Sequence, residues 1–163
     1  MDVDSDKPQE RELYGFGQNA CGELGLGDTV ERHTPTLSHS SRGKDIVHVQ
    51  AGNEFTAVLT NTGEVYTCGY NNEGQCGIEE SDGTVQDTVP FFAKVALLEP
   101  SFRPAGRISL VLSGNGCEHL VVVTDEGQLH TCGCNDSGQL GHGDVRRGYR
   151  GPRPSHALLE TEL

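Results

Sequence analysis

Short runs of apolar and β-branched residues alternate with turn residues along this chain. The clearest runs are Phe55–Thr60 and His119–Thr124, and their composition is typical of β-strands. The turns Asn61-Thr62-Gly63 and Asp125-Glu126-Gly127 follow them directly. Glycine in the third position suits the left-handed backbone of a three-residue hairpin loop. The pattern therefore predicts two β-hairpins.

Further strands are expected on both sides of each turn. Residues 64–68 and 128–132 supply the second strand of each hairpin, and residues 46–49 and 108–112 supply a strand upstream. A fifth apolar stretch, residues 91–98, is expected to form an edge strand followed by a short loop. No segment longer than ten residues has a convincing helical period. The chain is therefore predicted to be all-β.

One phrase occurs three times in the sequence. It occupies residues 13–28, 65–80 and 129–144, so the copies begin 52 and 64 residues apart. A second phrase, residues 52–63 and 116–127, precedes the last two copies at the same offset. The two phrases therefore form one repeating unit, and a proline follows each copy in the connecting segment.

Glycine makes up 22 of the 163 residues, and most of these glycines lie within the repeated phrases. They do not occur at every third position, which excludes collagen, and their number disfavours a helical bundle. Tight turns between strands explain them better than phosphate-binding loops, because neither a Walker loop nor a Gly-x-Gly-x-x-Gly helix start is present. Asn19, Asn71 and Asn135 recur in these turns and are expected to hydrogen-bond the turn backbone.

The order Gly, strand, Asn-Thr-Gly or Asp-Glu-Gly, strand, and Gly-x-Asn-x-x-Gly-Gln-x-Gly resembles the repeat of the regulator of chromosome condensation family. The resemblance covers residues 13–158. It implies a seven-bladed β-propeller with four antiparallel strands in each blade. The chain departs from the usual pattern where Cys68 and Cys132 replace an aromatic residue, Cys76 replaces leucine, and Phe55 replaces histidine.

The length of the chain allows only about 2.5–3 blades, which form an open arc of a regulator-of-chromosome-condensation-type propeller. The expected organisation is an acidic disordered tail (1–12), a partial β-propeller (13–158) with units of about 13–45, 46–107 and 108–158, and a C-terminal tail (159–163). An open arc leaves strand edges and blade faces unpaired. We therefore expect either a fragment of a longer propeller, which we favour, or a chain that self-associates through its open blade edges.

The chain carries a net charge of −12, which disfavours direct binding to nucleic acid. It lacks an apolar run long enough for a membrane helix, and residues 1–6 do not resemble a secretory signal. The expected location is cytoplasmic or nuclear, where the six cysteines are reduced thiols.

The reactive side chains do not form a recognisable catalytic or metal-binding set. Cys68, Cys76, Cys117, Cys132 and Cys134 raise the question of zinc, but their spacing differs from the usual pairs. Buried packing in the blades is the favoured interpretation, ahead of redox reactivity and of metal. The His119 position is structural in the family, so a hydrogen-bonding role is favoured over catalysis. We therefore predict no catalytic residue, no metal and no cofactor.

A cluster of positive charge stands out in this acidic chain. Arg146, Arg147, Arg150 and Arg153, with Tyr149 among them, lie in the connector after the third motif. An exposed group of this kind suits an acidic protein surface or a phosphate, although it also fits a solvated loop. These five residues are the candidate partner-binding site.

The expected function is a non-catalytic protein-interaction module, either a scaffold or a regulatory fragment of a larger protein. The resemblance implies protein partners among small GTPases, chromatin or ubiquitin-pathway components, and no membrane. One alternative is guanine-nucleotide exchange on a Ran-like small GTPase. Another is the regulatory part of a ubiquitin ligase or kinase.

Overall fold

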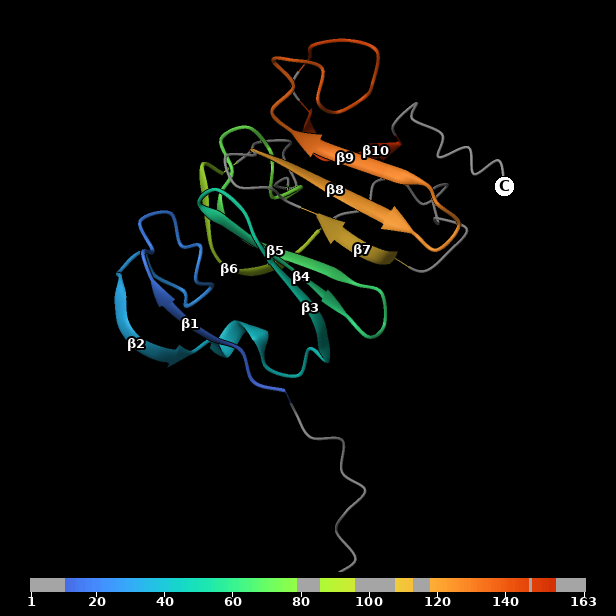
Figure 1. Ribbon diagram of the computed structural model, residues 1–163. Helices are drawn as coiled ribbons and strands as arrows, with labels where there is room; N and C mark the ends of the chain where they lie inside the picture. The colour runs from blue at the N-terminus through green and yellow to red at the C-terminus, as the bar shows by residue number, and fades with distance from the viewer. Residues whose placement is uncertain (1–10, 79–85, 96–107, 113–117, 147, 155–163) are drawn as a thin grey trace, which may run out of the picture.

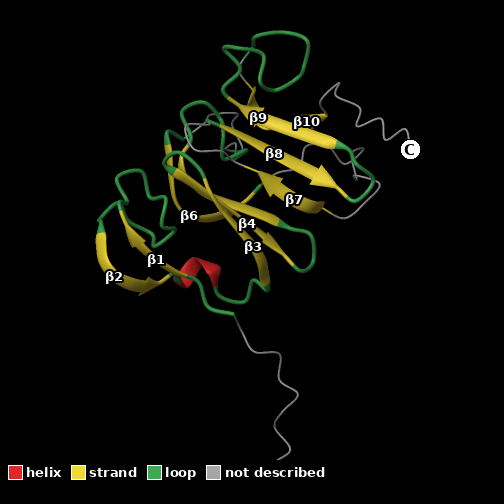
Figure 2. Cartoon of the chain, in the orientation of Figure 1, coloured by secondary structure: helices red, strands yellow, loops and turns green. Residues whose placement is uncertain are grey.

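The computed structural model describes residues 11–78, 86–95, 108–112, 118–146 and 148–154. Ten strands in these ranges form three antiparallel sheets. The sheets lie side by side in the order of the chain (Figure 1), and the described residues contain a single short 3-10 helix, η1 (His39–Ser41) (Figure 2). The tails predicted at 1–12 and 159–163 fall outside the described residues, apart from residues 11 and 12.

The first sheet has two strands and the other two sheets have four strands each. We call them the half blade, the middle blade and the last blade. The half blade contains β1 (Tyr14–Gly17) and β2 (Arg32–Leu37). The middle blade contains β3 (Ile46–Ala51), β4 (Phe55–Thr60), β5 (Val65–Tyr70) and β6 (Thr88–Lys94). The last blade contains β7 (Ile108–Leu112), β8 (His119–Thr124), β9 (Leu129–Gly133) and β10 (Gly148–Pro154).

The hairpins predicted from the apolar runs are confirmed. Strands β4 and β8 have the predicted bounds, and each pairs with the next strand in matching register: Ala57 faces Thr67, and Val121 faces Thr131. The turn glycine Gly63 has φ 82°, and its N–H donates to the carbonyl of Thr60 at 3.0 Å. This left-handed backbone is the one for which glycine was expected.

The outer strands β2 and β10 were not predicted. Residues 28–45 and the segment after the third motif were expected to be connectors, but they contain β2 and β10. The edge strand expected at 91–98 is present as β6, which spans Thr88–Lys94, and residues 96–98 fall outside the described residues. Strand β2 has three exposed residues in a row, between half-buried Arg32 at one end and half-buried Thr36 and Leu37 at the other, so it lacks the alternation of a half-buried strand. Pro35 in β2 and Pro90 in β6 lie on outer strands, where proline is tolerated.

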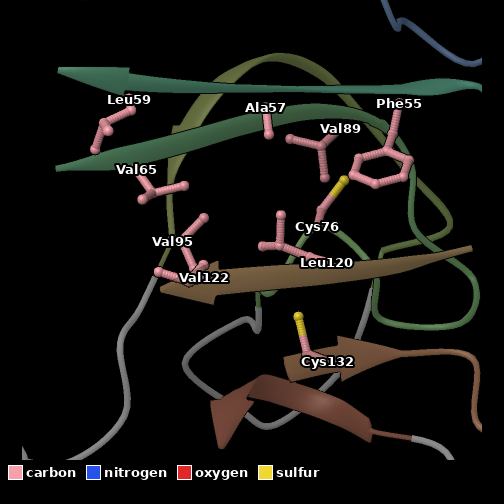
Figure 3. Close-up of a cluster of buried hydrophobic side chains, with 10 residues drawn as sticks. All are labelled: Phe55, Ala57, Leu59, Val65, Cys76, Val89, Val95, Leu120, Val122 and Cys132. Carbon is pink, nitrogen blue, oxygen red and sulfur yellow. The ribbon is translucent and has the colours of Figure 1, made fainter. Parts of the chain in front are cut away.

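The main hydrophobic core lies between the middle blade and the last blade. Phe55, Ala57 and Leu59 of β4 point towards Leu120 and Val122 of β8 (Figure 3). All five side chains are buried, so they supply most of the apolar area that holds the two sheets together. The cluster is completed by Val65, Cys76, Val89, Val95 and Cys132.

A smaller core lies between the half blade and the middle blade. Ile46, Val58, Cys68 and Phe92 form it, and Leu13, the residue before β1, packs against them. Side chains on one strand alternate between its two faces. Adjacent blades therefore pack face to face through alternating residues of their strands.

Candidate functional site

Each repeated glycine phrase forms a loop held by a buried asparagine. In the first loop (residues 19–28), the Asn19 side-chain oxygen accepts a hydrogen bond from the N–H of Leu24 at 2.9 Å. Its amide nitrogen donates to the carbonyls of Asp28 and Val30, at 2.9 and 3.1 Å. Asn19 is fully buried, so these bonds replace water for groups that would otherwise be unsatisfied.

The same bonds recur in the other two loops, which begin at Asn71 and at Asn135. The Asn71 oxygen accepts from the N–H of Cys76 at 2.8 Å, and the Asn135 oxygen accepts from the N–H of Leu140 at 3.0 Å. Both asparagines are fully buried. The predicted role of the three asparagines in turn geometry is therefore confirmed.

The first loop packs on the middle blade. A Cβ on Gly22 would lie 2.5 Å from the Cα of Pro90, and one on Gly25 would overlap the ring of Phe92. The N–H of Gly27 donates to the carbonyl of Pro90 at 2.8 Å. The glycines of this loop therefore allow the backbone of one blade to approach the outer strand of the next.

Acidic side chains gather at the end of the blades where these loops lie. We call Glu23, Glu54, Glu73 and Glu118 the acidic loop face. Burial raises the pKa of Tyr70, and the carboxylates of Glu118, Glu73 and Glu54, together with the Cys21 thiol, raise it further. Cys21 lies next to Glu54, with 3.7 Å between its sulfur and the Oε2 atom. Burial, assisted by Glu54 and Glu23, raises the pKa of this thiol to about 11.

Sequence reasoning missed the acidic loop face, although a signal for it exists. A glutamate occurs two residues after Gly52 and again two residues after Gly116, at Glu54 and Glu118. Glu54 has φ 56°, a backbone conformation that is uncommon for a residue other than glycine. Its carbonyl accepts from the N–H of Tyr70 at 2.7 Å, which fixes the start of β4 against the end of β5. The carbonyl of Glu118 accepts from the N–H of Cys134 at 2.7 Å in the same way, so both carboxylates lie at one end of the arc.

The structure places the predicted arginine cluster at the outer edge of the last blade. Arg146 is exposed and precedes β10, while Tyr149, Arg150 and Arg153 belong to β10, the outermost strand of its sheet. Arg147 falls outside the described residues. The cluster is thus carried by a strand as well as by a connecting segment.

Three of the described cysteines have the buried positions expected of packing residues, while Cys21 and Cys134 are half-buried. Cys68, Cys76 and Cys132 are completely buried, and Cys117 lies outside the described residues. Burial raises the pKa of the Cys76 thiol to about 12. Within the described ranges no three metal-ligating side chains come together.

The histidines do not form a constellation in the described part of the chain. His119 is half-buried, and its ring makes no hydrogen bond to another described residue; burial lowers its pKa. Its predicted hydrogen-bonding role therefore stays a prediction. His142 is hydrogen-bonded to Thr131, with 3.0 Å between Nε2 and Oγ1.

Asp28 and Asp144, which recur at one repeat position, accept hydrogen bonds from the backbone N–H of Val30 and of Arg146, both at 3.0 Å.

Among the described residues, no helix is long and apolar enough to cross a membrane.

The solved structures that resemble this chain share its fold. They include human WBSCR16, with a TM-score of 0.71 and 21% identity over 91% of this chain and 35% of that chain. They also include Prp20p from Saccharomyces cerevisiae, with a TM-score of 0.75 and 18% identity over 94% of this chain and 36% of that chain. The predicted fold class, an open arc of antiparallel propeller blades, is confirmed.

Curated proteins match the sequence at higher identity. Protein RCC2 homolog from Xenopus laevis is 33% identical over 133 residues, which are 82% of this chain and 24% of that protein. The ultraviolet-B receptor UVR8 from Arabidopsis thaliana is 32% identical over 137 residues, which are 83% of this chain and 28% of that protein. The chain thus spans about a quarter of the length of these relatives.

The family models match most of the sequence. The model of the regulator of chromosome condensation (RCC1) repeat matches residues 12–59, 62–115 and 126–158. A second model with the same description matches residues 46–75. The chain therefore belongs to the regulator of chromosome condensation repeat family.

Proposed function

We propose that this chain is a non-catalytic protein-interaction module, acting as a scaffold or as a regulatory fragment of a larger protein. The observation that carries the proposal is the use of the repeated polar residues. Asn19, Asn71 and Asn135 are buried and bond their own loops. The motif therefore builds the fold, and the exposed surfaces of the arc are left for partners. We take residues 13–45, 46–107 and 108–158 as its repeat units.

The partner-binding site that we propose is the arginine edge, made up of Arg146, Arg147, Tyr149, Arg150 and Arg153. It is supported by the outer position of β10 and by the exposure of Arg146. An edge strand also offers unpaired backbone groups. Guanidinium groups next to such an edge suit carboxylates or phosphates of a protein partner. A cytoplasmic or nuclear location fits a partner of this kind and stays a prediction.

Quantitative affinity capture tests this site. The immobilised chain is compared with a variant in which Arg146, Arg147, Arg150 and Arg153 are all alanine. The matched control replaces exposed basic residues elsewhere, Arg42→Ala and Lys94→Ala. We expect at least one protein to be retained by the wild type and the control and lost with the arginine variant. Identical sets of retained proteins for all three chains would contradict the arginine edge.

A second candidate function is nucleotide exchange on a Ran-like GTPase. It is favoured by the similarity to Prp20p, whose structure is described together with its binding properties to Gsp1p and histones. Release of labelled GDP from the GTPase tests it, and an unchanged release rate at high protein concentration would exclude exchange by this chain. A regulatory part of a ubiquitin ligase is favoured by the 33% identity to human E3 ubiquitin-protein ligase HERC2 over 136 residues. A regulatory part of a kinase stays a prediction.

A further inference from the structure

The chain forms the same blade-to-blade interface twice. The first loop packs on the middle blade through Gly22 and Pro90. The sulfur of Cys68 in the middle blade lies 3.4 Å from the carbonyl oxygen of Glu23 in the first loop. At the equivalent positions of the next interface, the sulfur of Cys132 lies 3.9 Å from the carbonyl oxygen of Gln75 in the second loop. The first and second loops thus each pack on the face of the blade that follows.

The third loop, residues 135–144, has the same geometry and ends the described arc. Gly138 is equivalent to Gly22, but among the described residues the nearest atom to a Cβ placed on Gly138 is the carbonyl oxygen of Asp144, at 4.0 Å within the same loop. The β-strands beside this loop show the same difference. Val121 is half-buried, whereas its equivalent Ala57 is completely buried. This C-terminal end face therefore continues an interface that the chain forms twice internally.

The opposite end of the arc presents a complementary surface. In β1, Tyr14 is 49% exposed and Phe16 is 64% exposed. The two alternate with Leu13, which packs towards the middle blade, so they lie on the other face of the half blade. Large apolar side chains with this exposure are typical of contact surfaces when they lie side by side. We call this surface the N-terminal end face.

The half blade also has the backbone positions that a glycine loop needs. Tyr14 pairs with Leu37 as Tyr66 pairs with Lys94, so β1 and β2 are equivalent to β5 and β6. Counting along the strands, His33 takes the place of Pro90, whose carbonyl accepts the hydrogen bond from Gly27. His33 is exposed, so its backbone is accessible to the loop of another molecule.

We propose that the C-terminal end face of one copy binds the N-terminal end face of a second copy, so that copies of this chain assemble head to tail. The third loop packs on β1 and β2 of the next copy as the first loop packs on β5 and β6. The two surfaces in contact differ, so the interface is heterologous and adds copies in one direction. This inference extends the proposed interaction function to other surfaces and does not use the arginine edge.

Charge gives the assembly a characteristic salt dependence. Each copy carries a net charge of −12, so copies repel one another at low ionic strength. The contacts proposed between the end faces involve the apolar side chains of Tyr14 and Phe16 and the glycine backbone of the third loop. Salt screens the repulsion and strengthens apolar contacts slightly. We therefore expect association to strengthen as sodium chloride is added, which is the reverse of an assembly held by ion pairs.

Sedimentation of the full chain, from low to high micromolar concentration, tests the proposal. We expect the average mass to rise with concentration beyond that of one copy. Phe16→Asp places a charge on the N-terminal end face, and Gly138→Asn places a side chain where the third loop would meet β2. Asparagine tolerates the left-handed backbone of Gly138, which has φ 75°. Each variant should weaken association about tenfold or more.

A mixture of the two variants makes the test specific. The Phe16→Asp variant keeps its C-terminal end face, and the Gly138→Asn variant keeps its N-terminal end face. One productive contact thus remains between unlike copies, so the mixture should form pairs that neither variant forms alone. The control is Gly127→Asn, a position with φ 78° and open space around it, which should associate as the wild type does.

Three outcomes would overturn the proposal. The first is an average mass of the wild type that stays that of one copy over the whole concentration range. The second is association that is unchanged in both variants. The third is a mixture of the variants that forms no pairs, although each variant keeps the wild-type urea midpoint. Binding of protein partners through the arginine edge would stand in each case, because the two experiments alter different residues.

Discussion

The side-chain oxygen of Asn135 accepts a hydrogen bond from the backbone N–H of Leu140 at 3.0 Å. Asn71 has the same relationship to Cys76 in the preceding loop. Both asparagines are fully buried, so their removal leaves backbone groups without a partner. An unsatisfied buried group costs about 1–3 kcal/mol.

We therefore expect Asn71→Ala to lower the free energy of unfolding by about 2–4 kcal/mol, because both a donor and an acceptor in the second loop lose their partner. Urea denaturation followed by circular dichroism measures the change. Gln18→Ala, at an exposed position next to the first loop, is the control and should have an effect within about 0.5 kcal/mol of zero. An equal effect of the two variants would show that the loop asparagine does not hold the fold.

The close contact between Gly25 and Phe92 leads to a second prediction, on the stability of the fold. A Cβ on Gly25 would overlap the Phe92 ring, which belongs to the smaller core. Gly25→Asn should therefore destabilise the chain by about 1–3 kcal/mol through overpacking. Gly43→Asn is the matched control, because Gly43 has φ 72° and open space around it. Urea midpoints that shift equally would indicate that backbone strain, and not the contact with Phe92, limits both positions.

The sequence predicts the strands whose residues are largely apolar. Phe55–Thr60 is buried at nearly every position and His119–Thr124 at alternate positions, so the apolar composition identifies both strands. Strand β2 has no buried residue, so no such signal exists for it. The role of the repeated asparagines was also predicted from the sequence. One asparagine occurs at the same position in each of the three loops, which indicates a shared function in holding the loop backbone.

The candidate surfaces could be predicted only in part. The arginines of the edge are adjacent in sequence, so their clustering was visible. The acidic loop face joins Glu23, Glu54 and Glu118 from separate repeats, and only the arrangement of the sheets brings them to one end. The end faces could not be predicted from the sequence either, because the exposure of Phe16 depends on which side of the half blade packs against the middle blade.

The half-buried His119 makes stability sensitive to acid. Burial lowers the pKa of His119 in the folded state, so the unfolded chain binds the proton more readily. The associated stability is fully present above the ordinary histidine pKa of about 6.5 and is lost as the pH falls through the folded-state value. His119→Phe installs the residue that the middle blade has at Phe55. We expect its urea midpoint to decrease less than that of the wild type when the pH is lowered below 6.5.

The exposed His39 provides the comparison for this measurement. His39→Gln removes a histidine without changing a blade face, so its pH profile should follow that of the wild type. A profile of His119→Phe that also follows the wild type would show that acid sensitivity arises elsewhere, with His130, whose pKa burial also lowers, as the next position to vary.

The buried thiols make the stability of the fold sensitive to high pH, whereas His119 makes it sensitive to low pH. Burial raises the pKa of Cys76 to about 12 and also raises the pKa values of Cys68 and Cys132. The folded chain therefore keeps these thiols protonated, while the unfolded chain releases the protons near the ordinary thiol pKa of about 8.5. The stability is fully present below that pH and decreases as the pH rises towards the folded-state values, by up to about 1.4 kcal/mol per pH unit for each thiol.

Cys76→Ala separates this effect from other alkaline changes. The variant loses some packing against the main core at every pH, but it should lose less further stability than the wild type between pH 9 and about 11, because one buried thiol is gone. Cys134→Ala, at a half-buried position, is the control. Urea midpoints measured across this pH range under reducing conditions test whether ionisation of Cys76 is coupled to unfolding. Parallel curves for the wild type and Cys76→Ala would show that ionisation of Cys76 is not coupled to unfolding, whereas a flatter curve for Cys76→Ala alone would link alkaline unfolding to the core between the blades.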